Sequence, residues 1–206
     1  YRFVVAPLAR RSGKSFISYE LAFLKALEPD TTILVMAPSY SLASIGWNHI
    51  KKLITGYGIE TDKLNQKDYE IHLSNGSMVK IGSVSRADSC VGRSYDLIIF
   101  DEADLSKDSE DAFQVSLRPT MDKPNSKAIF ISTPRGRRML WKFYNRGFTD
   151  DFPRWISIHS TCYANPDMSL EDIAEAKRAN SPEKFAQEYE ASFDVAEGQI
   201  YSAFTI

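Results

Sequence analysis

The sequence predicts an α/β fold with a mainly parallel central sheet flanked by helices. Short runs rich in β-branched residues alternate with longer amphipathic stretches, and no internal repeat interrupts this alternation. Several of the short runs are almost continuously apolar, as strands buried on both faces should be. These expected central strands are residues 3–6, 33–37, 97–100 and 128–131. Residues 155–159 alternate apolar and polar side chains, so we expect them to form a strand nearer an edge.

Amphipathic stretches fill the gaps between these strands. The expected helices are approximately residues 14–27, 42–57, 108–117 and 138–146. After Pro166, Ser169 is the expected N-cap of a further helix, and Ser181 followed by Pro182 opens another that runs through Phe193. We therefore expect a core at residues 1–165, followed at 166–206 by helices and a linker.

A β-hairpin is predicted around Ser74-Asn75-Gly76, which separates two alternating runs at residues 69–73 and 77–81. A three-residue loop gives the hairpin one mostly apolar face, whereas a two-residue Asn-Gly loop would mix the faces. We therefore prefer the longer loop, with Gly76 in the left-handed conformation. The resulting cross-strand pairs are Tyr69 with Ile81, Ile71 with Val79, and Leu73 with Ser77.

Composition excludes several classes of protein. The 206 residues carry a net charge of −2, which argues against coating nucleic acid by bulk electrostatics. Two cysteines and three histidines form no spaced cluster, so zinc fingers and disulfide scaffolds are excluded and a reducing cytoplasm is the simplest compartment. No apolar run approaches the roughly 20 residues that span a bilayer, so we expect no membrane insertion. The chain lacks an initiator Met and begins in a strand-like run, so we expect a further segment upstream.

The first strand leads into a phosphate-binding P-loop pattern that opens a helix. Backbone N–H groups of such a loop bind phosphate, the lysine reaches the β- and γ-phosphates, and the following hydroxyl ligates Mg²⁺. Leu8 stands where the general pattern has its first Gly, so the match is partial. The expected nucleotide-binding residues are Ala9, Arg10, Arg11, Ser12, Gly13, Lys14 and Ser15, with Ser15 as a metal ligand.

A Walker B pattern supplies the second half of this site. Residues 97–100 end in Asp101 and Glu102, at the carboxyl end of a strand expected beside the P-loop strand. Asp101 is expected to hold Mg²⁺ through water, and Glu102 to orient and deprotonate the attacking water. Two solvated acids at a strand end are the weaker alternative, because the P-loop pattern precedes them in the same chain.

A third set of polar groups follows the strand at residues 128–131. The hydroxyls of Ser132 and Thr133, next to Pro134, are expected at the same edge of the sheet, where they are able to sense the γ-phosphate. These residue types are also common wherever strands end, so this pattern alone is weak.

These motifs resemble the ATPase domain of the large terminase subunit, the DNA-packaging motor of tailed bacteriophages. The resemblance rests on the arginine-containing P-loop, the Walker B pair and the hydroxyl-rich motif. Residues 185–193 and 197–201 also look like that family's passage towards its nuclease domain. It implies a P-loop NTPase of the RecA-like (ASCE) class that uses ATP and Mg²⁺. It further implies double-stranded DNA, a portal protein and a small terminase subunit as partners, a homo-oligomeric ring, and transient docking on the procapsid portal in the host cytoplasm. We expect no nuclease activity in these 206 residues.

By the same resemblance, Arg10 is the candidate cis-acting arginine that stabilises charge on the transferring phosphoryl group. Arg93 is a weaker candidate for an arginine supplied to a neighbouring subunit. The alternatives are a phosphate-binding or surface role for Arg10 and a structural role for Arg93.

The candidate DNA contact is a cluster of cations after the hydroxyl-rich motif. Some of them fall at i, i+4 and i+8 and so share one helix face, which is able to meet a phosphate backbone without reading sequence. A solvated helix face is the equally weighted alternative. The members are Arg135, Arg137, Arg138, Lys142 and Arg146.

Two other functions compete with the motor. Residues 101–104 spell Asp-Glu-Ala-Asp, which favours the amino-terminal half of a DEAD-box-like helicase, although 206 residues leave no room for its second domain. The other competitor is a nucleotide-binding module that has lost hydrolysis. Glu102 argues against that module, because it retains the expected base.

Overall fold

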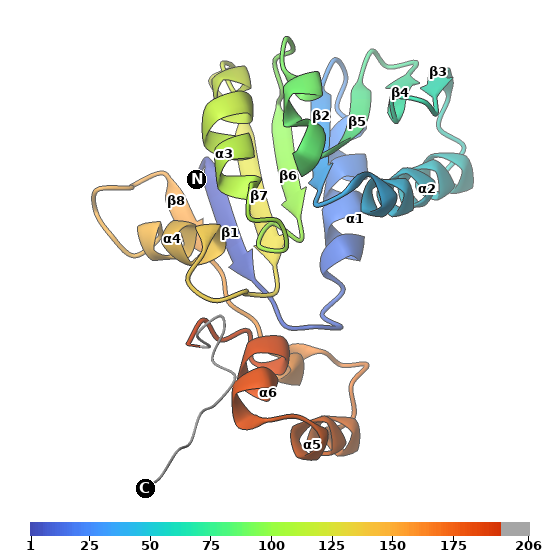
Figure 1. Cartoon of the computed structure of the whole chain (residues 1–206). Helices are drawn as coiled ribbons and strands as arrows, with labels where there is room; N and C mark the ends of the chain where they lie inside the picture. The colour runs from blue at the N-terminus through green and yellow to red at the C-terminus, as the bar shows by residue number, and fades with distance from the viewer. Residues whose placement is uncertain (195–206) are drawn as a thin grey trace, which may run out of the picture.

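The computed structural model describes residues 1–194, in which an eight-stranded sheet has the order β3-β4-β5-β2-β6-β7-β1-β8 (Figure 1). The strands from β5 to β8 in this order are parallel, while β3 and β4 are antiparallel to their neighbours. The α/β prediction is therefore confirmed. The strands are β1 (Phe3–Pro7), β2 (Thr32–Ala37), β3 (Thr61–Asn65), β4 (Glu70–Leu73), β5 (Met78–Ser83), β6 (Leu97–Asp101), β7 (Lys127–Ser132) and β8 (Trp155–Ser157).

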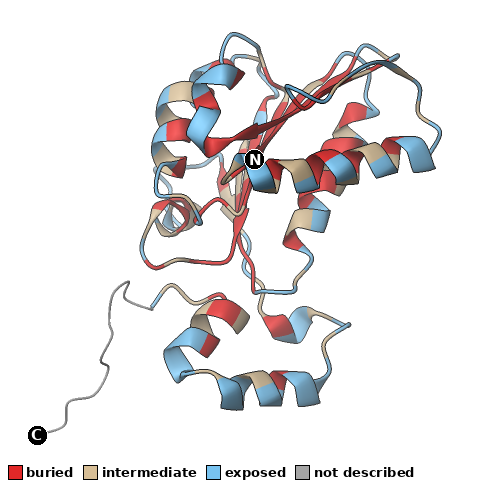
Figure 2. Cartoon of the chain, turned by 45° about the vertical axis from the view of Figure 1, so that its right-hand side comes forward, coloured by how far each residue is buried: buried red, intermediate tan, exposed pale blue. Residues whose placement is uncertain are grey.

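Helices cover both faces of the sheet, and two more lie below its carboxyl edge (Figure 1). They are α1 (Lys14–Ala26), α2 (Tyr40–Gly56), α3 (Ser109–Asp111), α4 (Met139–Arg146), α5 (Leu170–Ala179) and α6 (Pro182–Tyr189). Side chains alternate across each central strand: Ile33 and Val35 pack with α1 and α2, whereas Leu34 and Met36 face the core on the other side. Buried residues accordingly concentrate on the strands in Figure 2, and the outer helix faces are exposed.

The hairpin has the predicted register. Ile71 pairs with Val79, Leu73 N–H donates to the Ser77 carbonyl at 2.8 Å, and Gly76 has φ of 84°. The structure adds a feature that we did not predict: β5 also pairs with β2, so the hairpin extends the parallel sheet. The preceding segment, β3, completes the antiparallel edge, but its largely exposed side chains have no apolar alternation that would reveal a strand.

The structure differs from the predicted elements most clearly in three segments. Residues 108–117 begin as α3 and continue as a π-helical turn, Ala112–Leu117, which carries Phe113 into the core. The last helix, α6, ends at Tyr189 rather than Phe193, and β8 ends at Ser157. Ser169 and Ser181 are the N-caps predicted for α5 and α6. The boundary near residue 165 stays a prediction, and its linker at residues 195–206 lies outside the described residues.

Gly147 is required by a close approach between the end of α4 and β8. A Cβ at this position would lie 2.7 Å from the backbone nitrogen of Ser157, so Gly147→Ala should lower the free energy of unfolding by about 1–3 kcal/mol. Gly56→Ala, at the end of α2, meets no described atom within 4 Å and is the matched control. Urea unfolding of both variants measures the difference; equal stabilities would contradict the predicted clash.

Among residues 1–194, no helix combines the length and the apolar character needed to cross a membrane.

Candidate active site

The P-loop presents free backbone donors at the start of α1. Arg11 and Gly13 adopt left-handed φ values of 59° and 74°, and no side chain in the described part of the chain caps this helix. In contrast, Ser39 accepts a capping hydrogen bond at α2, as do Ser169 and Ser181 at α5 and α6. The first turn of α1 also contains no acidic residue. The uncapped N–H groups and the helix dipole therefore favour an anion at this end.

Lys14 connects the P-loop with the Walker B residues. Its side chain is buried, with Nζ 3.2 Å from the Ala9 carbonyl oxygen and 3.6 Å from Glu102 Oε1. Glu102 has a left-handed φ of 52°, a strained conformation for this residue, and its Oε2 accepts a hydrogen bond from Ser132 Oγ at 3.3 Å. Three separate elements thus bring the predicted lysine, base and sensor hydroxyl together.

Hydroxyl groups from one face of α1 surround the Asp101 carboxylate. Ser15 Oγ donates to Oδ1 at 3.1 Å, and the Tyr19 hydroxyl donates to Oδ2 at 3.0 Å. Ser18 Oγ lies 3.5 Å from Oδ1. Burial raises the pKa of Asp101, whereas these hydrogen bonds and Lys14 oppose that shift. Burial and Asp101 also raise the pKa of Tyr19, which therefore stays a hydrogen-bond donor.

The strand order corrects one prediction about this site. We expected the Walker B strand beside the P-loop strand, but β7 lies between β6 and β1 and pairs with both. Ser132, at the end of β7, is consequently flanked by the P-loop on one side and by Asp101 and Glu102 on the other. The hydroxyl motif is therefore at the centre of the site.

Ser15, Asp101, Glu102 and Thr133 are among the residues that line a cleft of about 260 Å³. Two polar side-chain atoms, Thr133 Oγ1 in the lining of this cleft and Ser12 Oγ in the P-loop, are buried without a hydrogen-bond partner among the described residues. Burying an unpaired hydroxyl is unfavourable, so both atoms fit a site that is completed by a phosphate group. Ser15 and Asp101 offer the oxygen ligands that Mg²⁺ prefers. The donor set thus suits a magnesium nucleotide.

Arg10 lines the cleft, but its guanidinium is engaged by an acid of the C-terminal helices. Its Nε lies 3.0 Å from Glu188 Oε2, while Arg135 donates to the other carboxylate oxygen at 2.7 Å. Glu188 belongs to α6, is 6% exposed, and its carbonyl oxygen also accepts the Arg10 N–H at 2.7 Å. The structure therefore ties the P-loop to the C-terminal helices. Sequence reasoning missed Glu188, because nothing in its local pattern distinguishes it from the other acids of α6.

Asp104 is a second residue that the sequence analysis passed over. Its buried carboxylate accepts the backbone N–H groups of Arg135 at 2.8 Å and Leu140 at 3.0 Å, and its own N–H donates to Ser132 Oγ. Burial raises the pKa of this carboxyl group, and these bonds oppose the rise. Asp104 therefore fixes the loop between β7 and α4 relative to the Walker B strand. Its position two residues after Glu102, at the end of the Asp-Glu-Ala-Asp run, is the sequence signal that could have found it.

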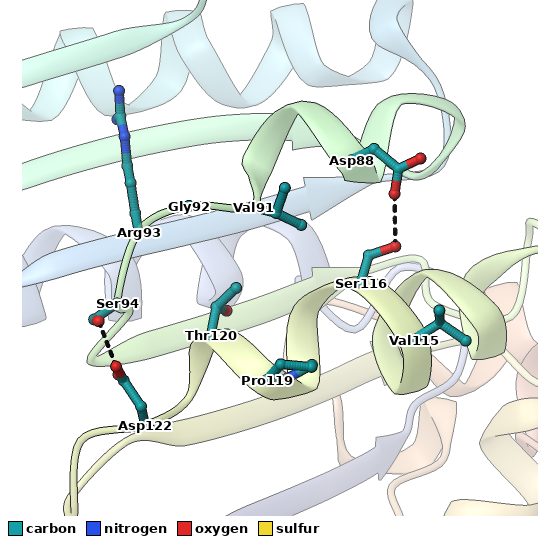
Figure 3. A pocket seen from close by; sticks show the side chains of 10 residues that line it. All are labelled: Asp88, Val91, Gly92, Arg93, Ser94, Val115, Ser116, Pro119, Thr120 and Asp122. Atoms are coloured by element: carbon teal, nitrogen blue, oxygen red, sulfur yellow. Dashed lines mark hydrogen bonds between the residues drawn. The ribbon is translucent and has the colours of Figure 1, made fainter.

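Arg93 lies at the amino end of the strands, away from the nucleotide cleft. Its guanidinium is 3.0 Å from Glu70 Oε1. Arg93 is one of ten residues that line a larger cavity of about 590 Å³, which the hydrogen bonds Asp88–Ser116 and Ser94–Asp122 border (Figure 3). The lining of this cavity includes none of the residues predicted to bind nucleotide. Within the part of the chain that the structure describes, Arg93 makes no contribution to the nucleotide cleft, and a role in a neighbouring subunit stays a prediction.

The predicted DNA-contact cluster is largely engaged within the chain. Lys142 is paired with Glu110 at 2.7 Å and Arg135 with Glu188, while Arg146 stacks over Phe143 and Trp155 at 4.5 and 4.8 Å. Burial and nearby Arg118 lower the pKa of Arg146. Glu110 and Trp155, which engage two of these cations, come from other elements, and contact of the cluster with DNA stays a prediction.

Comparison with known proteins supplies the family. A family model for the N-terminal part of terminase large subunits of the T4likevirus type matches residues 6–206. The large terminase subunit of Escherichia phage T5 is 58% identical over 204 residues, which cover 99% of this chain and 47% of that protein. The chain belongs to the terminase large subunit family.

Solved terminase structures share the fold. The large terminase ATPase domain of Thermus phage P74-26 matches with a TM-score of 0.75 and 23% identity, covering 93% of this chain and 88% of that domain. The large terminase of a thermophilic bacteriophage in complex with ADP matches with a TM-score of 0.76 and 16% identity, covering 99% of this chain and 51% of that one. The chain spans about half the length of the curated terminase subunits it matches, and these comparisons do not favour the helicase alternative.

Proposed function

We propose that this chain is the ATP-hydrolysing motor part of a phage terminase large subunit that drives double-stranded DNA into a procapsid. The observation that carries the proposal is the contact of Lys14 and Ser132 with Glu102, which lines the same cleft as Asp101 in a terminase-family chain. Complexes of the thermophilic phage terminase with ADP and with ATP-γ-S support nucleotide binding at such a site.

Each residue has a defined task in the proposed reaction. The P-loop N–H groups and Lys14 bind the β- and γ-phosphates, while Ser15 and Asp101 hold Mg²⁺, which when bound neutralises phosphate charge. Glu102 accepts a proton from the attacking water. The Ser132 and Thr133 hydroxyls respond to the presence of the γ-phosphate. Asp104 transmits a shift of Ser132 to the loop before α4, since it bonds to both.

In the proposed reaction Arg10, which lines the cleft, exchanges its ion pair with Glu188 for the γ-phosphate. Because an arginine that stabilises the transferring phosphoryl group contributes about 10³–10⁵ in rate, Arg10→Ala should lower kcat by at least about 10³-fold. Nucleotide affinity should change far less. Arg178→Ala, an exposed arginine of α5, is the control. Steady-state hydrolysis and equilibrium nucleotide binding separate the two effects; a kcat equal to that of the control would show that Arg10 is structural.

The nucleic-acid partner is tested by measuring ATP hydrolysis without nucleic acid, with duplex DNA and with single-stranded RNA. We expect duplex DNA to stimulate hydrolysis most, and stimulation by RNA alone would favour the helicase alternative.

The wider proposal has the chain act in a homo-oligomeric ring with a portal protein and a small terminase subunit, in the cytoplasm of the bacterial host. Cross-linking to purified portal in the presence of ATP tests that assembly.

A further inference from the structure

The hydroxyl groups around Asp101 are unevenly divided between its two carboxylate oxygens. Ser15 and Ser18 both approach Oδ1, whereas among the described residues the Tyr19 hydroxyl alone donates to Oδ2. Ser18 Oγ also donates to the Lys14 carbonyl oxygen at 3.1 Å, so its hydrogen is shared. Tyr19 therefore supplies the bond that fixes the rotation of the carboxylate and keeps Oδ1 facing Ser15.

Tyr19 reaches Asp101 because the neighbouring helix, α2, has a glycine where the Tyr19 ring passes. The ring is 3% exposed and passes over Gly46 in the middle of α2. A Cβ on Gly46 would lie 2.6 Å from Tyr19 Cε1 and 2.8 Å from Cζ. Glycine in a helix interior costs about 1 kcal/mol relative to alanine, and its φ here is not left-handed, so the backbone does not require it. The physical reason for a glycine at position 46 is that the Tyr19 ring occupies the space of its missing side chain.

We propose that Tyr19 is a positioning residue for magnesium binding. Because Gly46 of α2 has no side chain, the Tyr19 ring has the space it needs to bring its hydroxyl group to Asp101. The inference rests on the proposed function, since it assumes that Ser15 and Asp101 hold the ion. Hydrogen bonds to a metal-binding carboxylate restrict it to the orientation that the ion needs, and losing such a partner typically weakens metal affinity about 10-fold to 100-fold. No step of hydrolysis requires Tyr19 to touch the nucleotide.

The decisive variant is Tyr19→Phe, which removes the hydroxyl and keeps the ring. Binding of a fluorescent ADP analogue is titrated with Mg²⁺ in the full chain, and repeated in EDTA. We expect the Mg²⁺ concentration for half-maximal binding to rise at least about tenfold, with unchanged affinity in EDTA. Tyr95→Phe is the matched control, because Tyr95 is also buried but donates to the Cys90 carbonyl oxygen at the other end of the sheet.

Gly46→Ala tests whether the space beside Gly46 is needed to place Tyr19, and Gly56→Ala on the same helix is its control. Gly46→Ala should reproduce the rise in the Mg²⁺ requirement, and the rise should not increase further in the double variant with Tyr19→Phe, because both changes break one bond. If Gly46→Ala does not fold, Tyr19→Phe still decides the question.

The outcomes separate this inference from the proposed function. A normal Mg²⁺ requirement in Tyr19→Phe, alongside Mg²⁺-dependent binding by the wild type, would overturn the role of Tyr19 and leave the proposed function intact. Equal loss of affinity in EDTA and in Mg²⁺ would reduce Tyr19 to a packing role. Nucleotide binding by the wild type that ignores Mg²⁺ would overturn both.

Discussion

Glu102→Gln is expected to lower kcat for ATP hydrolysis by about 10²–10⁴-fold, the range that a positioned general base contributes. The amide keeps the size of the side chain and its ability to accept the hydrogen bond from Ser132 Oγ, but it is not able to take a proton from water. Binding of ATP should persist, because Glu102 is not a phosphate ligand in the proposed mechanism. The variant should therefore accumulate bound ATP.

Single-turnover hydrolysis and equilibrium binding measure the two halves of this prediction. Glu110→Gln is the control, since Glu110 pairs with Lys142 away from the cleft. If Glu102→Gln hydrolyses ATP at the rate of the wild type, another group must activate the water.

Lys14→Ala should eliminate measurable turnover and weaken nucleotide binding. The Lys14 side chain is 7% exposed and its ammonium group is directed between the Ala9 carbonyl and Glu102, so it meets the phosphates with little solvent competition. Losing charge-assisted bonds of this kind should weaken ATP affinity by about 100-fold.

Direct binding of a fluorescent ATP analogue checks this expectation. Lys25→Ala is the matched control, because Lys25 lies in the last turn of the same helix and pairs with Glu28 at the surface. Binding by Lys14→Ala at the affinity of the control, with the fold intact by circular dichroism, would remove the P-loop from the proposed site.

The sequence was sufficient to predict those features whose physical cause lies within a few neighbouring residues. The alternation of apolar residues in the hairpin left one register that buries a single face, and Ile71 pairs with Val79 as that requires. Ser169 and Ser181 identified helix starts because an N-cap needs only its own next turn. The P-loop and Walker B pair were also found locally, since each lies at the junction of one strand with the next segment.

Other features depend on segments that are distant in sequence. Neither β6 nor β1 indicates that β7 separates them, and Arg10 carries no mark of its pairing with Glu188 of α6. The cations on α4 likewise carry no local mark of their partners, since Glu110 and Trp155 come from other elements, and contact with DNA stays a prediction.

By itself, the sequence determined the α/β class, the hairpin register and the residue types of the proposed magnesium nucleotide site, because periodicity and strand-end chemistry are encoded over a few neighbouring residues. Only the tertiary structure decided how these parts meet: Ser132 between the two phosphate motifs, Arg10 on Glu188, and Tyr19 on Asp101 through the space above Gly46. The physical reason is that such contacts arise from close packing between distant segments, where a missing Cβ or one buried carboxylate determines which groups come within bonding distance.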